Sequence, residues 1–168
     1  MNSLGLWIYT AFSSILPEPR CFSTKATILR VCGAKVGRNV RINSFVRILG
    51  TGRLGIGDDV WLGAGVFLSP VGDAAITIGS HCDFRPQVMV LTGSHEINPG
   101  GEHIGGRGTA QSVTIGAGSW LGARATVLPG VTLPAKTMVA SGAVVTRGTA
   151  AEKTLLAGVP ATARKVFG

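Results

Sequence analysis

Cysteine is scarce in this sequence, and its positions exclude the commonest cysteine chemistries. The 168 residues include three cysteines, Cys21, Cys32 and Cys82. Their spacing fits neither a zinc site nor a redox pair. We expect Cys82, which occupies a position that is otherwise small and apolar, to be a reduced thiol in the core. This use of cysteine favours a cytoplasmic protein.

Long hydrophobic runs are absent as well. The most apolar stretch, residues 1–16, lacks the positively charged start of a signal peptide. It is also too short to span a bilayer. Both observations agree with a cytoplasmic location.

Acidic residues are few. The chain has 8 of them against 16 lysines and arginines, which gives a formal net charge of +8. Such an excess suggests nucleic acid, an anionic membrane or an anionic ligand as a partner. The basic residues are scattered, with few aromatic residues between them, and this disfavours nucleic acid. A small molecule that carries a polyphosphate is the better candidate.

A period of six residues runs through most of the chain. From Ile115 onward, each block of six opens with an aliphatic residue and has a small or β-branched residue in fifth place. The openers are Ile115, Leu121, Val127, Leu133, Val139 and Val145, and the fifth-place residues are Ser119, Ala125, Val131, Thr137, Ala143 and Thr149. A period of six matches neither an α-helix nor a long strand, but it matches one side of a triangular β-solenoid. Three blocks make one coil, and the chain has enough blocks for about five coils.

The period starts at Val36 and has one long interruption. Earlier blocks also keep a small residue in fifth place, as at Cys82 and Ser94. Residues 91–113 then break the pattern and are rich in glycine. We expect an extruded loop on a rigid scaffold here, and such loops often carry function.

The residues before the repeats suggest helices. A wide apolar face with a spacing of four predicts a first helix, formed by Leu4, Ile8, Phe12 and Leu16. Pro17 and Pro19 would end it, and a second short helix over residues 25–32 would end at Gly33. We interpret residues 1–35 as a helical cap over the open first coil. Peripheral contact with a membrane or a lipid-linked glycan is the alternative. The β-helix would then occupy residues 36–150, and residues 151–168 a C-terminal tail.

The interruption also contains the residues best suited to proton transfer. His95 and His103 lie there with Glu96 and Glu102, and histidine titrates near neutral pH. His95 is the stronger candidate because it lies where the loop leaves the coil, so the scaffold would fix its backbone. We expect His81, in a repeat turn, to be structural or simply exposed.

The repeat and several longer motifs carry a resemblance to a known family. The sequence resembles the hexapeptide-repeat (left-handed β-helix) acyltransferases, and among them the sugar O-acetyltransferases of the maltose, galactoside and colanic acid type. The matching segments are residues 92–96 (TGSHE), 115–123 (IGAGSWLGA), 127–132 (VLPGVT), 139–147 (VASGAVVTR) and 157–161 (AGVPA).

This resemblance implies a left-handed coil, a homotrimer with each active site between two subunits, and acetyl-CoA as co-substrate without a metal. It places the catalytic histidine at His95, which would remove a proton from the acceptor hydroxyl. Backbone N–H groups would stabilise the oxyanion, and transfer would be direct because no serine or cysteine is paired with a base. Glu96 would orient His95 or hold the sugar.

The resemblance also suggests where CoA binds, along the later coils. By position, the contacts fall on Trp120, Ala123, Ser141 and Thr146, although turns require small residues there in any case. Charge favours contacts of the CoA phosphates with basic residues of the C-terminal part, namely Arg147, Arg164 and Lys165.

The sequence departs from the family at two points. Thr162 stands where relatives often have a basic residue. Residues 62–65 lack the asparagines of the maltose and galactoside branch, which disfavours those sugars.

We therefore predict an acetyl-CoA-dependent O-acetyltransferase acting on a sugar hydroxyl of a glycan, polysaccharide or sugar-nucleotide intermediate. An acetyltransferase acting on an aminosugar or an amino acid such as serine is the alternative. A zinc enzyme of the γ-carbonic-anhydrase kind shares the fold but needs three converging histidines. A non-enzymatic scaffold is the remaining interpretation.

Overall fold

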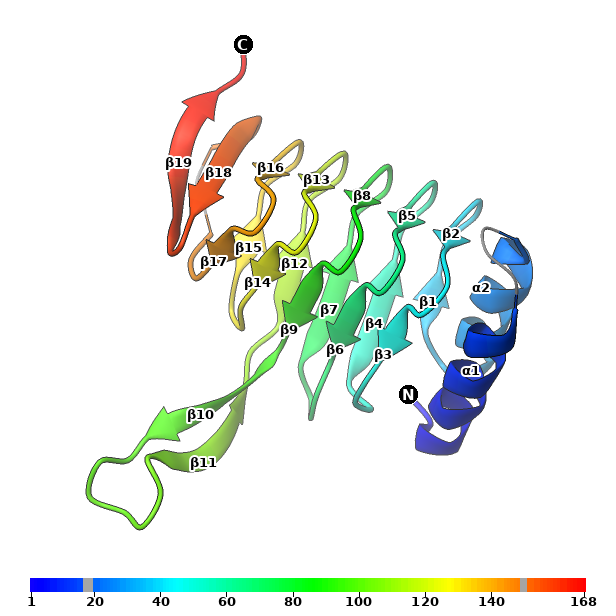
Figure 1. Ribbon diagram of the computed structural model, residues 1–168, viewed down its shortest axis with the longest axis horizontal. Helices are drawn as coiled ribbons and strands as arrows, with labels where there is room; N and C mark the ends of the chain where they lie inside the picture. Colours follow the sequence, from blue (N-terminus) through cyan, green and yellow to red (C-terminus); the bar gives the residue numbers. More distant parts are fainter. Residues whose placement is uncertain (17–19, 149–150) are drawn as a thin grey trace.

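The computed structural model is a parallel β-solenoid with two helices at its N-terminal end (Figure 1). It describes residues 1–16, 20–148 and 151–168. The predicted solenoid of about five coils with N-terminal helices is confirmed. The predicted break at Pro17 and Pro19 and the fifth-place residue Thr149 lie outside the described residues.

Short strands stack into three sheets, one on each side of the solenoid, and each coil passes through sheets 1, 2 and 3 in turn. Sheet 1 contains β1 (Lys35–Val36), β4 (Arg53–Ile56), β7 (Ala75–Ile78), β12 (Val113–Ile115) and β15 (Thr132–Leu133). Sheet 2 contains β2 (Arg41–Ile42), β5 (Trp61–Leu62), β8 (Asp83–Phe84), β13 (Trp120–Leu121), β16 (Met138–Val139), β18 (Thr154–Gly158) and β19 (Ala161–Val166). Sheet 3 contains β3 (Arg47–Ile48), β6 (Phe67–Ser69), β9 (Met89–Leu91), β14 (Thr126–Val127) and β17 (Val144–Val145).

The core consists of the residues that the six-residue period singled out. All six openers from Ile115 to Val145 are buried, and so are the fifth-place residues from Ser119 to Ala143. Ser94 is an exception, because the chain has already left the solenoid and its side chain is exposed. Thr92 is the last buried residue before the chain leaves the solenoid.

The corners between sheets are tight turns that stack on one another. In most turns the fourth residue of the block has a positive φ, as in Gly118 (69°) and Arg124 (61°). A Cβ atom on Gly122 would collide with the backbone of Ser141 in the next coil. Backbone N–H groups join successive turns: that of Gly142 donates to the Ala123 carbonyl at 2.9 Å.

The two helices pack at the start of the first coil. Helix α1 (Ser3–Ile15) is capped by the Asn2 side chain, which accepts from the backbone N–H of Leu4. Helix α2 (Phe22–Val31) is followed by Gly33 with a φ of 93°, as predicted for the residue that ends this helix.

The apolar residues that indicated the first helix are mostly not the ones that it buries. Leu6, Tyr9 and Ser13 are its buried residues, whereas Leu4, Ile8 and Phe12 of the predicted apolar face are exposed. Because the helix is apolar on nearly every side, the sequence pattern did not determine which side would pack against the coil.

Two antiparallel hairpins interrupt or end the parallel stacking. Strands β10 (Gly93–Ile97) and β11 (Gly105–Ala110) form one where an irregular loop was expected. Strands β18 and β19 form the other within the predicted C-terminal tail, and β18 extends sheet 2. Figure 1 shows the first hairpin projecting from the corner between sheets 3 and 1.

Replacement of one opener tests the packing of the core. Leu121 is fully buried, so Leu121→Ala should lower the free energy of unfolding by about 2–5 kcal/mol by leaving a cavity. Thr132→Ala, on an exposed residue of the solenoid, should change it by less than about 0.5 kcal/mol. Urea unfolding followed by circular dichroism measures both, and equal effects would contradict the assignment of the core.

Candidate functional site

His95 lies on the projecting hairpin, where its ring is held by the opposite strand. In register, His95 of β10 pairs with Gly108 of β11. Its Nδ1 atom is 2.9 Å from the carbonyl oxygen of Gly106. A carbonyl oxygen only accepts hydrogen bonds, so Nδ1 carries the proton and Nε2 of the neutral ring is free to take one.

A concave surface of about 460 Å³ adjoins His95 at the base of the hairpin. Its walls are the strand segments around Gly93 and Gly108 and the corner at Val71 and Gly72. Glu96 does not line this concavity, and it makes no hydrogen bond or ion pair with His95 among the described residues. The predicted base therefore faces an open space without a carboxylate beside it.

The hairpin beyond His95 has few contacts with the solenoid. Ile97 and Ile104 near its tip are both largely exposed. The hairpin leaves the corner between sheets 3 and 1 (Figure 1), and sheet 2 forms the third side of the triangle, opposite that corner. Residues on sheet 2 are consequently out of reach of His95 within one copy of the chain.

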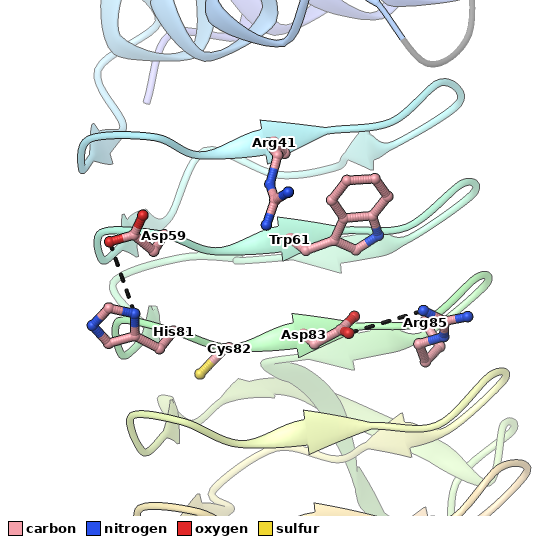
Figure 2. A pocket seen from close by; sticks show the side chains of 7 residues that line it. All are labelled: Arg41, Asp59, Trp61, His81, Cys82, Asp83 and Arg85. Carbon is pink, nitrogen blue, oxygen red and sulfur yellow. Dashed lines mark ion pairs between the residues drawn. The ribbon is translucent and has the colours of Figure 1, made fainter.

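Sheet 2 carries a groove of about 690 Å³ that sequence reasoning missed (Figure 2). Its lining is mostly polar and consists of Arg41, Asp59, Trp61, His81, Cys82, Asp83 and Arg85. The repeat pattern in the sequence could have revealed this groove. In each strand of sheet 2, the residue before the buried one faces outward. Strand pairing aligns three such outward residues, Arg41, Trp61 and Asp83.

The charges of this groove alternate in sign. The guanidinium of Arg41 lies 4.9 Å from the centre of the Trp61 ring. One Asp83 oxygen is 3.9 Å from Arg85, whereas the other is buried without a hydrogen-bond partner. His81 is an exposed turn residue, and its Nδ1 is 3.8 Å from a carboxylate oxygen of Asp59. An aromatic face flanked by donors and acceptors suits a sugar or sugar phosphate.

Cys82 borders the groove but is no candidate nucleophile. Its side chain is buried, as predicted, and its Sγ–H donates to the Gly116 carbonyl at 3.3 Å. Burial raises the pKa of the Cys82 thiol, so the reactive thiolate is disfavoured.

The residues predicted to contact CoA form two separate groups. The first lies on the outer face of sheet 2 and at the corner that follows it. Trp120 is exposed there and pairs with Asp83 of the groove, while Ala123 and Ser141 lie in stacked turns at the next corner.

The second group lies near the C-terminal hairpin. Thr146 and Arg147 line a cavity of about 560 Å³ with residues 160–163. Arg164 and Lys165 are exposed on β19, outside the lining of that cavity. One copy therefore does not gather the predicted contacts into a single pocket.

Within residues 1–16, 20–148 and 151–168, no cluster of three or more histidine, cysteine, aspartate or glutamate side chains could hold a metal ion. His81, His95 and His103 do not converge in the described part of the chain.

Comparison with known proteins agrees with the sequence analysis. The family model described as the hexapeptide repeat of succinyl-transferase matches residues 112–147. A protein of Escherichia coli K12 named colanic acid biosynthesis acetyltransferase is 37% identical over 117 residues, which cover 68% of this chain and 60% of that protein. The chain thus spans about three fifths of the length of this relative. The predicted resemblance to hexapeptide-repeat acyltransferases is confirmed.

Solved structures share the fold at low sequence identity. A maltose O-acetyltransferase from Clostridium difficile is 21% identical with a TM-score of 0.64, over 97% of this chain and 84% of that one. The N-acyltransferase AntD from Bacillus cereus, solved with dTDP and 3-hydroxybutyryl-CoA, is 19% identical with a TM-score of 0.68, over 78% and 71% of the two chains.

The hydrogen bond of His95 fixes a measurable tautomer. Neutral His95 should carry its proton on Nδ1, because Gly106 offers only an acceptor. Exposed His103 makes no hydrogen bond within the described residues and should favour the Nε2–H form of free imidazole. Long-range ¹H–¹⁵N correlation spectra distinguish the two forms, and an Nε2–H signal from His95 would contradict the ring orientation.

Proposed function

Because this chain is a hexapeptide-repeat protein that resembles acetyltransferases, we propose that it transfers an acetyl group from acetyl-CoA to a hydroxyl of a sugar or sugar-nucleotide intermediate. The observation that carries the proposal is the geometry of His95. Its ring is held through Nδ1, its Nε2 is free, and it borders an open concavity. The name of the E. coli relative supports the reaction class.

In the proposed reaction, Nε2 of His95 takes the proton of the acceptor hydroxyl as the oxygen attacks the thioester carbonyl. The C–O bond forms, and backbone N–H groups stabilise the oxyanion. Collapse of this intermediate breaks the C–S bond, and the leaving CoA sulfur takes the proton from His95. Cys82 is buried and hydrogen-bonded, which favours direct transfer over an acyl-enzyme.

We place the complete site between two copies of the chain. His95 projects from the corner opposite sheet 2, whereas Trp120 and the polar groove lie on sheet 2. In a ring of three copies, each copy would extend its hairpin over sheet 2 of the next. This arrangement would bring His95 of one copy close to Trp120 and the groove of its neighbour. Such head-to-tail contacts close naturally into a symmetric trimer.

The groove on sheet 2 is the proposed acceptor subsite. The Trp61 ring beside Arg41 would contact a sugar, and the half-exposed Asp83 carboxylate would accept a hydrogen bond from a hydroxyl. The guanidiniums of Arg41 and Arg85 suit a phosphate. These features favour a phosphorylated sugar, such as a sugar nucleotide, over a free amino acid.

Acetyl-CoA would extend from this groove over sheet 2 toward the corner that follows it. Trp120 lies on sheet 2, and Ala123 and Ser141 lie in the stacked turns of that corner. Basic residues near the C-terminus would meet the CoA phosphates by charge, namely Arg147, Arg164 and Lys165. Glu96 is next to His95 but makes no hydrogen bond or ion pair with its ring within the described part of the chain, so we assign it to the acceptor side.

Acetyl transfer is tested by the release of free CoA thiol. With acetyl-CoA and a panel of sugars, sugar nucleotides and aminosugars, His95→Ala should lower acceptor-dependent release at least about a hundredfold, since it removes the general base. His103→Ala, at an exposed hairpin position, should stay within about twofold of wild type. Full activity in His95→Ala would refute the assigned base. A response to amines alone would favour the aminosugar or amino acid alternative.

Mixed assemblies test whether two copies share the site. The two variants to combine are His95→Ala and Trp120→Ala, each of which should be impaired alone. When they are denatured and refolded together at a 1:1 ratio, activity should return to about one quarter of the wild-type value. The reason is that one site in four then combines an intact hairpin from one copy with an intact sheet 2 from the next. Separately refolded chains that are mixed afterwards are the control. No recovery in the co-refolded sample would place the site within a single copy.

A further inference from the structure

Helix α1 presents an apolar surface that the solenoid does not cover. The exposed fractions are 65% for Leu4, 70% for Trp7, 53% for Phe12 and 82% for Ile15. The helix contains no charged residue from Ser3 to Ile15. We call these four residues with Ile8 the α1 surface. A contiguous exposed patch of this kind commonly marks an interaction site.

The apolar character continues across a neighbouring groove. A cavity of about 400 Å³ lies between α1 and the corner at residues 47–51. Trp7 lines one side, and Leu49, which is 56% exposed, lines the other. Arg47 also lines this groove, so a positive charge borders the apolar surface.

The surroundings of α1 are strongly basic. Residues 1–59 contain eight of the 16 lysines and arginines and three of the eight acidic residues, and one of these, Asp58, pairs with Arg38 at 3.1 Å. Arg20 and Arg30 are exposed at opposite ends of the α2 region, and Lys35 and Arg38 are exposed in the first coil. These elements lie together at one end of the molecule (Figure 1).

We propose that this end of the molecule docks on an anionic lipid bilayer, with α1 lying in the plane of the head groups. The α1 surface would enter the interface, where tryptophan is favoured, and the surrounding arginines and lysines would attract the anionic head groups. A charge-free helix flanked by basic residues fits the general pattern of interfacial helices.

Length and charge argue against other occupants. Thirteen residues give a helix of about 20 Å, short of the roughly 30 Å of the hydrocarbon core. Among the described residues, no helix is long and apolar enough to cross a membrane. A second copy on the same surface would bring two basic ends together, and like charges repel there. An anionic bilayer would instead neutralise them.

Binding to lipid vesicles tests the proposal without acetyl-CoA or any acceptor, so its outcome is independent of the proposed reaction. Wild type should co-sediment with phosphatidylcholine vesicles that contain about 30 mol % phosphatidylglycerol. Its binding to them should be at least about tenfold stronger than to vesicles of phosphatidylcholine alone. High salt should weaken the binding to the anionic vesicles. The double variant Trp7→Glu/Ile15→Glu should lose at least about tenfold of this binding. Both side chains are exposed, so the fold should persist, which circular dichroism checks.

Val166→Glu is the matched control, because this exposed residue lies on β19 at the opposite end of the solenoid. It should bind vesicles within about twofold of wild type. The proposal is overturned if wild type ignores the anionic vesicles, or if the control loses as much binding as the double variant. A lower molar mass of the double variant by light scattering would instead identify the α1 surface as a contact between copies.

Discussion

The hydrogen bonds between successive coils are the constraint from which the rest of the structure follows. Backbone N–H groups of one coil donate to carbonyls of the next, as from Trp61 to Cys82 and from Asp83 to Ser119. Because the strands are two to four residues long in most coils, none is stable without its neighbours above and below. This pairing also fixes the positions of outward side chains. The groove on sheet 2 exists because Arg41, Trp61 and Asp83 occupy equivalent places in three consecutive coils.

The solenoid could be predicted because its periodicity arises from burial. An opener such as Leu121 must face the interior in every coil, so its chemical character repeats in the sequence. The hairpin of β10 and β11 leaves no comparable trace. Its strands are rich in glycine and largely exposed, and the contact between His95 and Gly106 depends on a cross-strand register that no local pattern encodes. Helix α1 illustrates a third case: the sequence indicated a helix, but Leu6 and Tyr9 were buried in preference to Leu4 and Ile8 for reasons of tertiary packing.

The candidate site was therefore predictable in its residues but not in its arrangement. His95 and Trp120 were identified as separate candidates, yet the sequence does not reveal that they lie across the solenoid from one another. That separation follows from topology, since the hairpin interrupts the coil between sheets 3 and 1. A rigid scaffold with a long arm at one corner supports chemistry between neighbouring copies more readily than within one.

The C-terminal hairpin has a consequence for the molecule as an assembly. A parallel solenoid ends in a row of unpaired backbone groups onto which another coil, or another molecule, could add. Strand β19 runs antiparallel to β18 at this edge and carries Arg164 and Lys165. Its reversed direction and positive charge make the edge a poor template for another parallel coil, and α1 and α2 occupy the opposite end. Sheet 2 is thereby closed by the reversed strand at one end of the solenoid, and helices lie at the other end. Both features oppose growth into fibres, to which repetitive β structure is otherwise prone.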